Sequence, residues 1–359
     1  MGELADIWLQ DRAVLELLWK LRRGFQSPAQ AAQDLSYFDD ILECKVHELL
    51  RELLAEGVFV PPSPIDILGF YNVTGLKGLL KQSGLKVSGK RNELEARLLG
   101  SAKEMLSELA RRSDRFVLSN RAQAAVLAYR EECKYQRRKA EEFSLRALLD
   151  GNFEKAARIV VEFEKCQVLK RGIGINWSSH LVSGMTERAS QIFEVKPAIL
   201  DKVLPPTLEY LRAAAAMMEL WGTGVREMKR WIPKGLETGL AIDDTSAAHM
   251  IYNSALHTRR MKKYREDDSG VVGVQIVAIM AAVACELCRW HDGRMYLLDD
   301  VPELPHSCCT SEAGCRCTVV PVLDWTWEDL MAGDKALEKR WFGYLKGESA
   351  PRTMKEALS

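Results

Sequence analysis

Six of the nine cysteines lie between Cys285 and Cys317, and this cluster constrains the fold more than any other feature of the chain. Residues 1–8 are acidic and lack the basic and apolar segments of a signal peptide, so we expect a cytoplasmic protein. In that setting clustered cysteines indicate a metal site in preference to disulfides or free thiols. The longest apolar run, residues 271–285, is too short to span a membrane, so no membrane partner is expected.

The spacing of the cysteines indicates the metal and its ligands. A C-x-x-C pair lets two thiolates meet one ion, and Zn²⁺ takes four such ligands in a tetrahedron. We therefore predict structural Zn²⁺, with the choice of four ligands left open. The candidate ligands are Cys285, Cys288, Cys309, Cys315 and Cys317, with His306 and Cys308 as substitutes.

Short extended segments surround these cysteines. Residues 272–279 and 318–323 are rich in β-branched side chains and predict strands. Asp292-Gly293 is a tight hairpin signal, after which residues 295–298 would return as a third strand. Residues 271–359 are thus predicted to form a small α+β zinc-binding module.

The order of motifs in this module resembles a phage family. A strand leads into C-x-x-C, followed by an Asp-Gly turn, a proline-rich stretch and a C-R-C that precedes a strand. The matching residues are Cys285, Cys288, Asp292, Gly293, Pro302, Pro305, His306, Cys315, Arg316 and Cys317. This pattern resembles the C-terminal region of the minor head (head-morphogenesis) proteins of Mu-like phages, and it implies a bacterial or phage protein. Residues 307–314 are an insertion relative to that family.

A second patterned stretch runs from residue 74 to residue 99. Leucines at helical spacing precede Gly84, and Leu85 and Val87 then alternate with polar residues as in a short extended link. A second helix follows Gly89, and Thr74 is placed to cap the first helix. Residues 66–100 are therefore predicted to form a helix–extended–helix module.

This module resembles the SAP motif, which binds duplex DNA. The matching residues are Leu76, Lys77, Leu80, Gly84, Leu85, Ser88, Gly89, Lys90, Leu94, Arg97 and Leu98. SAP modules grip DNA through the turn and the start of the second helix. The resemblance therefore implies that Lys86, Ser88, Gly89, Lys90 and Arg91 face the DNA backbone.

The charges of the stretch agree with this interpretation. Six basic residues outnumber Glu93 and Glu95, which leaves a net charge of plus four. Lys90 and Arg91 lie in the first turn of a helix, where cations are unfavourable and a bound anion would relieve the conflict. The alternative is an ordinary surface with solvated lysines. The predicted DNA-contacting residues are Lys77, Lys86, Ser88, Gly89, Lys90, Arg91 and Arg97.

The remaining segments predict helices. Residues 1–60 predict three helices, at 11–21, from the Ser27-Pro28 cap, and at 40–54, followed by a strand, an order that loosely resembles a winged helix. That segment holds six basic and eleven acidic residues, so we expect it to contact protein instead of DNA. Prolines 61, 62 and 64 predict a stiff connector. Residues 101–270 predict a helical domain. Its basic run at 259–265 reflects either the preference for cations at a helix C-terminus or a second phosphate-facing patch.

Together these segments predict a mainly α, multi-domain protein with units at 1–60, 66–100, 101–270 and 271–359. We expect a non-enzymatic protein that binds double-stranded DNA and has a protein partner or self-associates. One alternative is a SAP-targeted, metal-dependent nuclease, for which His291 and Asp292 form the only His–carboxylate pair beside the cysteines. The other alternative is a phage or prophage head-assembly protein.

Overall fold

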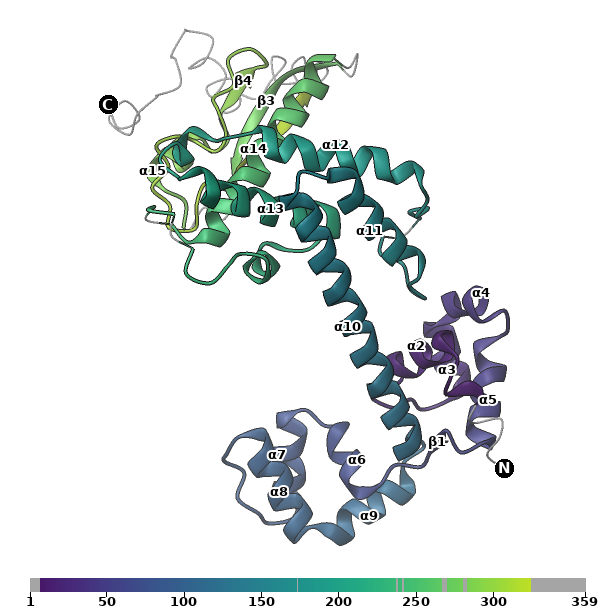
Figure 1. Ribbon diagram of the computed structural model, residues 1–359. Helices are drawn as coiled ribbons and strands as arrows, with labels where there is room; N and C mark the ends of the chain where they lie inside the picture. The colour runs from purple at the N-terminus through teal and green to yellow at the C-terminus, as the bar shows by residue number, and fades with distance from the viewer. Residues whose placement is uncertain are drawn as a thin grey trace. The chain divides into compact units, whose positions relative to one another are not determined.

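The computed structural model describes residues 7–172, 174–236, 238–240, 242–266, 270–279 and 283–323 (Figure 1). Within them the chain is mostly helical, with a small antiparallel sheet near the C-terminus. The chain divides into two compact units, residues 1–137 with 167–169 and residues 138–166 with 170–359. No helix among the described residues combines the length and the apolar character needed to cross a bilayer.

The N-terminal part of the first unit contains α2 (Arg12–Lys20), α3 (Pro28–Asp34) and α5 (Val46–Ala55), with a shorter helix before α5. The Asp11 carboxylate accepts the first amides of α2, and the predicted Ser27 cap of α3 is confirmed by its bond from the N–H of Gln30. The helices pack around fully buried leucines, so burial of one face of each helix fixes the arrangement.

The single helix predicted over residues 40–54 is wrong. A short 3₁₀ turn, η1 (Ser36–Phe38), leads into α4 (Asp39–Leu42), and Glu43 then adopts a left-handed conformation with φ of 53°. The Asp39 carboxylate accepts the N–H of Val46 at 2.9 Å and the ammonium of Lys45 at 2.8 Å. That carboxylate therefore caps α5 from a distance, which explains why the chain ends one helix and begins another.

A four-helix insertion interrupts the small sheet of the first unit. Strand β1 (Phe59–Val60) pairs antiparallel with β2 (Val117–Leu118), which comes from beyond the insertion. The winged-helix character of residues 1–60 stays a prediction. Between the two strands lie α6 (Pro64–Gly69), α7 (Val73–Gln82), α8 (Arg91–Ser101) and α9 (Lys103–Arg112).

We call residues 64–112 the inserted module, because its helices enclose a hydrophobic core of their own. Leu76, Leu80, Leu94 and Leu98 are each fully buried in it. The prediction of a stiff connector at prolines 61, 62 and 64 is wrong in part. Pro64 is the first residue of α6, and Ser63 is its N-cap.

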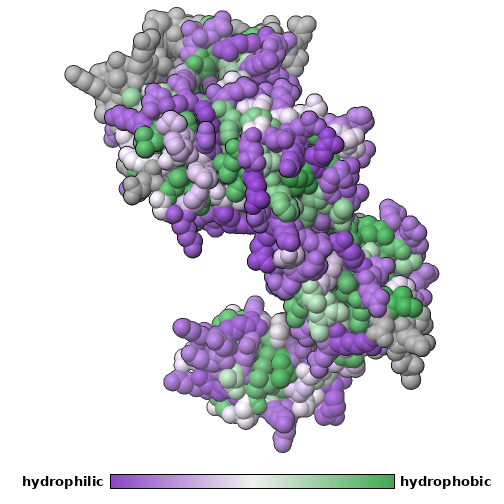
Figure 2. All heavy atoms as spheres, in the orientation of Figure 1, coloured by the Kyte–Doolittle hydropathy of each residue, from purple (hydrophilic) through white to green (hydrophobic). Residues whose placement is uncertain are grey.

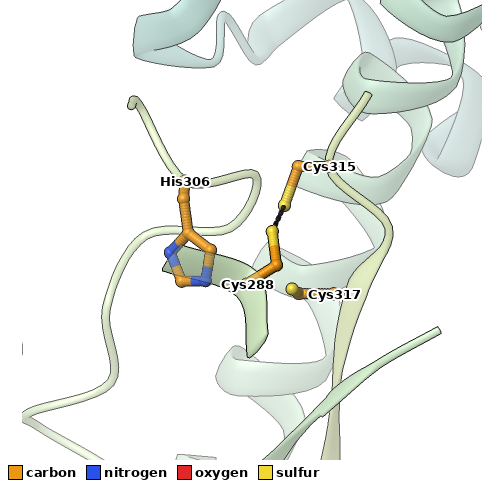
Figure 3. Close-up of side chains that lie close together, drawn as sticks. All are labelled: Cys288, His306, Cys315 and Cys317. Carbon is orange, nitrogen blue, oxygen red and sulfur yellow. Dashed lines mark hydrogen bonds between the residues drawn. The ribbon is translucent and has the colours of Figure 1, made fainter. Parts of the chain in front are cut away.

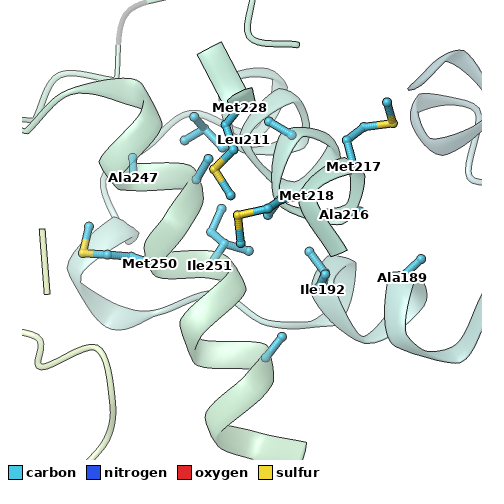
Figure 4. Close-up of a cluster of buried hydrophobic side chains, with 14 of the residues drawn as sticks. Ala189, Ile192, Leu211, Ala216, Met217, Met218, Met228, Ala247, Met250 and Ile251 are labelled. Atoms are coloured by element: carbon cyan, nitrogen blue, oxygen red, sulfur yellow. The ribbon is translucent and has the colours of Figure 1, made fainter. Parts of the chain in front are cut away.

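The second unit contains the C-terminal part of α10 (Asn120–Leu149) and four further long helices. These are α11 (Phe153–Lys165), α12 (His180–Glu194), α13 (Pro205–Trp221) and α14 (Asp244–Glu266), with η2 (Ala198–Leu200) and η3 (Val225–Arg230) between them. Figure 4 shows how side chains of α12, α13 and α14, including Ile192, Met218 and Ile251, meet in one core. The alanine-rich middle of α13 is wholly buried, as close packing of helices requires.

Helix α13 ends at Trp221, immediately before a glycine. Gly222 adopts φ of 54° immediately after α13, and a Cβ there would collide with the guanidinium of Arg171. Because glycine takes this left-handed conformation without strain, Gly222 terminates the helix. The chain then continues as η3.

The sheet of the second unit has the order β4-β3-β5, with both pairs antiparallel. Its strands are β3 (Val271–Ala278), β4 (Met295–Leu297) and β5 (Cys317–Leu323). The predicted tight hairpin is wrong, because α15 (Glu286–His291) lies in the connection from β3 to β4. Asp292 instead accepts the N–H of Ala278 at 2.9 Å, which fastens the end of α15 to the sheet.

The sheet and the helices of the second unit share one hydrophobic core. Val274 and Ile276 of β3 belong to the same buried cluster as Trp221 and Ile251. The sequence predicted a domain boundary near residue 270, and the structure has a continuous core on both sides of it. Residues 324–359 of the predicted zinc-binding module lie outside the described residues.

Candidate metal centre and nucleic-acid interface

The start of α15 brings the first two cysteines together. Cys285 is the N-cap residue, and its Sγ accepts the N–H of Cys288 at 3.5 Å. A side-chain cap of this kind turns the thiol back over the first turn of the helix, toward the side chain three residues later. Both thiols are buried, and Cys288 is only 2% exposed.

The loop after β4 and the start of β5 supply the other donors. The N–H of Cys309 bonds to the carbonyl of His306 at 3.1 Å, which folds this part of the loop into a turn. Gly314, with φ of 71°, makes a second turn just before Cys315. Cys317 begins β5 opposite Ala278, so the sheet itself fixes its position.

These segments converge in two overlapping groups of buried donors, the first of which is drawn in Figure 3. In the first group, the ligand atoms of Cys288, His306, Cys315 and Cys317 all lie within 4.8 Å of one another. In the second group, the same is true of Cys285, Cys288 and Cys309. The Cys288 thiol lies 3.7 Å from that of Cys309 and 3.9 Å from that of Cys315. These buried groups could hold a metal ion.

Two buried imidazoles stack at the edge of this cluster. The rings of His291 and His306 lie 4.2 Å apart, centroid to centroid, and the His291 Nδ1 lies 2.7 Å from the Tyr296 hydroxyl. Burial lowers the pKa of His291 to about 3 and also lowers the pKa of His306. The described residues offer no hydrogen-bond partner to Nε2 of either ring. Neutral imidazole with a free lone pair is the form that binds a metal.

Hydrogen bonds among the thiols favour thiolate at several positions. Bonds from Cys288 and then Cys315 lower the pKa of Cys317 to about 5. The pKa values of Cys309 and Cys315 are also lowered, chiefly by bonds from Cys285 and Cys288 respectively. Because metal binding requires the thiolate, these contacts favour a bound cation at Cys309, Cys315 and Cys317, whereas hydrogen bonds with the neighbouring thiols raise the pKa of Cys288.

All five cysteines predicted as ligands meet at this cluster, and the substitute His306 joins them. The other substitute, Cys308, is half-buried and belongs to neither group, with its Sγ 3.8 Å from the Ser307 hydroxyl. Sequence reasoning could not choose among these donors, because the loop from residue 298 to residue 316 has no periodicity that orients a side chain.

The pair suggested for a nuclease is held by structural contacts. His291 is fully buried, and its Nδ1 lies against Tyr296. Asp292 accepts the N–H of Ala278. Neither contact favours a role in hydrolysis.

In the first unit, α7 and α8 pack around the buried leucines of the inserted module and are joined by the turn at residues 83–90, while the assignment of residues 66–100 to a helix–extended–helix module stays a prediction. The predicted Thr74 cap is wrong, because Asn72 accepts the N–H of Gly75 at 2.9 Å and α7 begins at Val73. At the other end the N–H of Gly84 bonds to the carbonyl of Lys81, and that of Leu85 to the carbonyl of Leu80. This paired arrangement satisfies the last carbonyls of α7 and directs the chain into the turn.

The predicted DNA-contacting residues separate into two sets. Lys77, Lys86, Ser88, Gly89 and Lys90 are exposed on α7 and the turn, and Lys81 is exposed with them. Arg97 is half-buried and donates to the carbonyls of Lys86 and Ser88, so it holds the turn in place. Arg91 is exposed, but it bonds to Glu95 at 2.6 Å and to the Leu68 carbonyl at 3.2 Å.

The start of α8 already has an internal anion. The Glu93 carboxylate accepts the N–H of Lys90 at 3.2 Å, which offsets the unfavourable position of Lys90 and Arg91. The N–H of Lys90 is therefore bonded to Glu93 and is not available to an external anion. Gly89 is favoured here because its φ of 132° is a backbone conformation that residues with a side chain rarely adopt.

The three arginines of the basic run at the end of α14 contact other elements of the second unit. Arg259 pairs with Glu219 at 3.2 Å, and Arg260 donates to the Thr318 hydroxyl at 2.6 Å. Arg265 donates to the Leu298 carbonyl at 2.8 Å. These arginines tie α14 to α13 and to the strands, which supports the structural alternative over a second phosphate-facing patch.

The described residues thus contain a buried Cys/His cluster in the second unit and an exposed basic turn in the first. Figure 2 shows that the surface over α7, α8 and their connecting turn is mostly hydrophilic. No protein-family model, no curated protein and no solved structure matches this chain.

Proposed function

We propose that this is a non-enzymatic protein that binds duplex DNA through the turn between α7 and α8. The observation that carries the proposal is a set of exposed lysines on and beside a turn that internal contacts hold in place. Lys86 and Lys90 lie within it, and Lys77 and Lys81 lie on the preceding helix. A cationic surface of this kind binds phosphates without reading bases.

The bracing of the turn supports the proposal. A flexible loop of lysines loses conformational entropy when it binds, whereas a turn that is already ordered does not. Here Arg97 donates to two carbonyls of the turn. The backbone bonds from the N–H groups of Gly84 and Leu85 fix the start of the turn, and the bond to the Glu93 carboxylate fixes its end. The lysine side chains therefore project from a rigid backbone.

The resemblance to the SAP motif supports the same surface. In SAP modules the turn and the start of the second helix contact the DNA backbone, and here these positions are Lys86, Ser88, Gly89 and Lys90. We assign phosphate contact to these residues, with Lys77 at the flank. Arg97 is assigned to positioning, since its guanidinium is used within the module.

The Cys/His cluster is assigned structural Zn²⁺. Zn²⁺ binds thiolate and imidazole in closed tetrahedral sites, and the cluster offers only these donors, all buried. When bound, the metal supplies no chemistry to a substrate. It would link α15, the loop from residue 298 to residue 316, and β5, and so add stability where that loop has little core of its own.

A turn with three or four phosphate contacts binds weakly, with nonspecific dissociation constants on the order of 10⁻⁴ to 10⁻⁶ M. Useful affinity then requires a second attachment. Self-association or a protein partner would raise the effective concentration of the turn near DNA. The acidic N-terminal part of the first unit is the segment we assign to such a protein contact.

The test is fluorescence anisotropy of a labelled duplex with the full chain over a salt series. The variant Lys86→Ala/Lys90→Ala removes two exposed charges from the turn. We expect weaker binding at every salt concentration, and a log–log salt slope smaller by about 2, since each phosphate contact contributes about 0.9.

The matched control is Lys20→Ala/Lys155→Ala, which removes the same charge from exposed positions outside the inserted module. It should bind as the unaltered protein does. Equal loss in both variants would mean that net charge and not the turn governs binding. No binding at low salt would contradict the proposed function altogether.

A further inference from the structure

We propose that the Cys/His cluster holds two tetrahedral metal ions that share the thiolates of Cys288 and Cys315. This inference rests on the metal site proposed above and extends it from one ion to two. It assigns all six buried donors of the cluster to one structure.

The first step is the number of donors. A closed zinc site takes four ligands, and six side chains converge here. A single ion would leave two cysteines buried beside it without a metal. Two four-coordinate ions need eight ligand positions, so six donors suffice if two thiolates bridge.

The second step is the overlap of the two groups. Cys288 is the one residue that belongs to both groups found among the described residues, so its thiolate is the first bridge. The second bridge is assigned to Cys315, whose Sγ lies 3.9 Å from that of Cys288 and whose thiol also interacts with those of Cys309 and Cys317. The remaining donors then form two terminal pairs, Cys285 with Cys309 and His306 with Cys317.

The third step is the spacing of the sulfur atoms. Zn–S bonds of about 2.3 Å place two sulfurs of one tetrahedron about 3.8 Å apart. The Sγ atoms of Cys285 and Cys309 are 3.7 Å apart, and those of Cys288 are 3.7 Å from Cys309 and 3.9 Å from Cys315. Cys288 thus lies at a tetrahedral edge distance from a donor of each proposed ion.

The fourth step is charge. One divalent ion held by His306 and the three thiolates of the first group has a net charge of minus one. The second ion adds two positive charges and brings two further thiolates, from Cys285 and Cys309, so the net charge of the buried cluster is unchanged. Each thiol that binds loses its proton to water, and no electron is transferred. The second ion therefore adds no uncompensated charge to the interior.

The test is native mass spectrometry of the full chain, purified in the presence of Zn²⁺ and then dialysed. The unaltered protein should contain two zinc ions. Cys285→Ser and Cys317→Ser each remove a terminal ligand of a different ion, and each should retain one. Cys308→Ser is the matched control, since Cys308 lies beside the cluster but in neither group, and it should retain two.

X-ray absorption at the zinc edge gives a second measurement that needs no variant. Bridging thiolates hold the ions close together, so we expect a metal–metal scattering shell. One zinc per chain, or two without that shell, would overturn the shared-thiolate cluster but leave a structural zinc site intact. Protein without metal, or with iron and inorganic sulfide, would overturn the zinc assignment as well.

Discussion

Arg97 is the residue whose replacement most directly tests how the inserted module presents its lysines. Its guanidinium donates to the carbonyls of Lys86 and Ser88, which anchors the turn to α8. Arg97→Lys keeps the charge, but its ammonium ends a side chain one bond shorter than that of Arg97, whose Nη1 donates to both carbonyls. If Arg97 braces the turn, this variant should loosen it without changing the number of phosphate contacts.

The size of the effect follows from the two hydrogen bonds. A hydrogen bond contributes about 0.5–1.5 kcal/mol net, and water can replace it at exposed carbonyls, so losing one should cost about 1 kcal/mol. That free energy corresponds to a roughly fivefold larger equilibrium constant for opening of the turn. DNA affinity should fall by at most a similar factor, because only the fraction of molecules with an open turn must order it on binding.

Amide hydrogen exchange of the full chain, read on peptides that cover residues 83–90, measures the opening directly. The salt series measures whether the slope of DNA binding is retained. Unchanged exchange in Arg97→Lys would refute the bracing role. A slope reduced by about 1 would refute it differently, by showing that Arg97 itself contacts phosphate.

Three further predictions concern stability. Leu98→Ala should destabilise the inserted module by about 2–5 kcal/mol, since Leu98 is fully buried. The control is Leu99→Ala at a half-buried position, which should lower the unfolding temperature less. Burial, and then Arg316, lower the pKa of His249 to about 4, so folding favours the neutral ring. The stability from this histidine is present above pH 6.5 and declines as the pH falls toward 4, by about 1–2 kcal/mol between pH 7 and pH 5. Urea titrations at both pH values should show this loss, and a smaller one in His249→Gln. Removing metal with a strong chelator should speed hydrogen exchange over residues 285–317 and leave residues 64–112 unchanged, whereas equal protection of the cysteine segment would mean that metal does not stabilise it.

Local signals in the sequence were sufficient where one residue determines a local structure. The Ser27 cap, the Gly84 stop and the strand at residues 272–279 are confirmed, because each depends on neighbours within a few positions. The convergence of the cysteines was also predictable, since C-x-x-C and C-x-C spacings limit how the thiols can be placed.

Contacts between distant residues were not predictable in this way. Asp39 caps a helix that begins at Val46, and no periodicity in the sequence shows that a carboxylate will reach across the break. Arg97 was expected at phosphate because charge alone does not reveal that turn carbonyls use its guanidinium.

Helix α12 was missed although the sequence contains a signal for it. Its buried residues Val182, Met185, Ala189 and Ile192 recur at intervals of three and four, as one face of a helix requires. The intervening residues are polar and the segment has no side-chain cap, so the pattern is weak until the partner helices are known.

The pairing of β1 with β2 has a consequence for how the chain is assembled. Val60 and Val117 are partners in the ladder, so the chain leaves and re-enters the first unit at neighbouring points. The inserted module therefore begins and ends at neighbouring positions of the two-stranded sheet. A short linker joining these strands would give a chain without the module, and another compact domain with closely spaced ends could be grafted in its place.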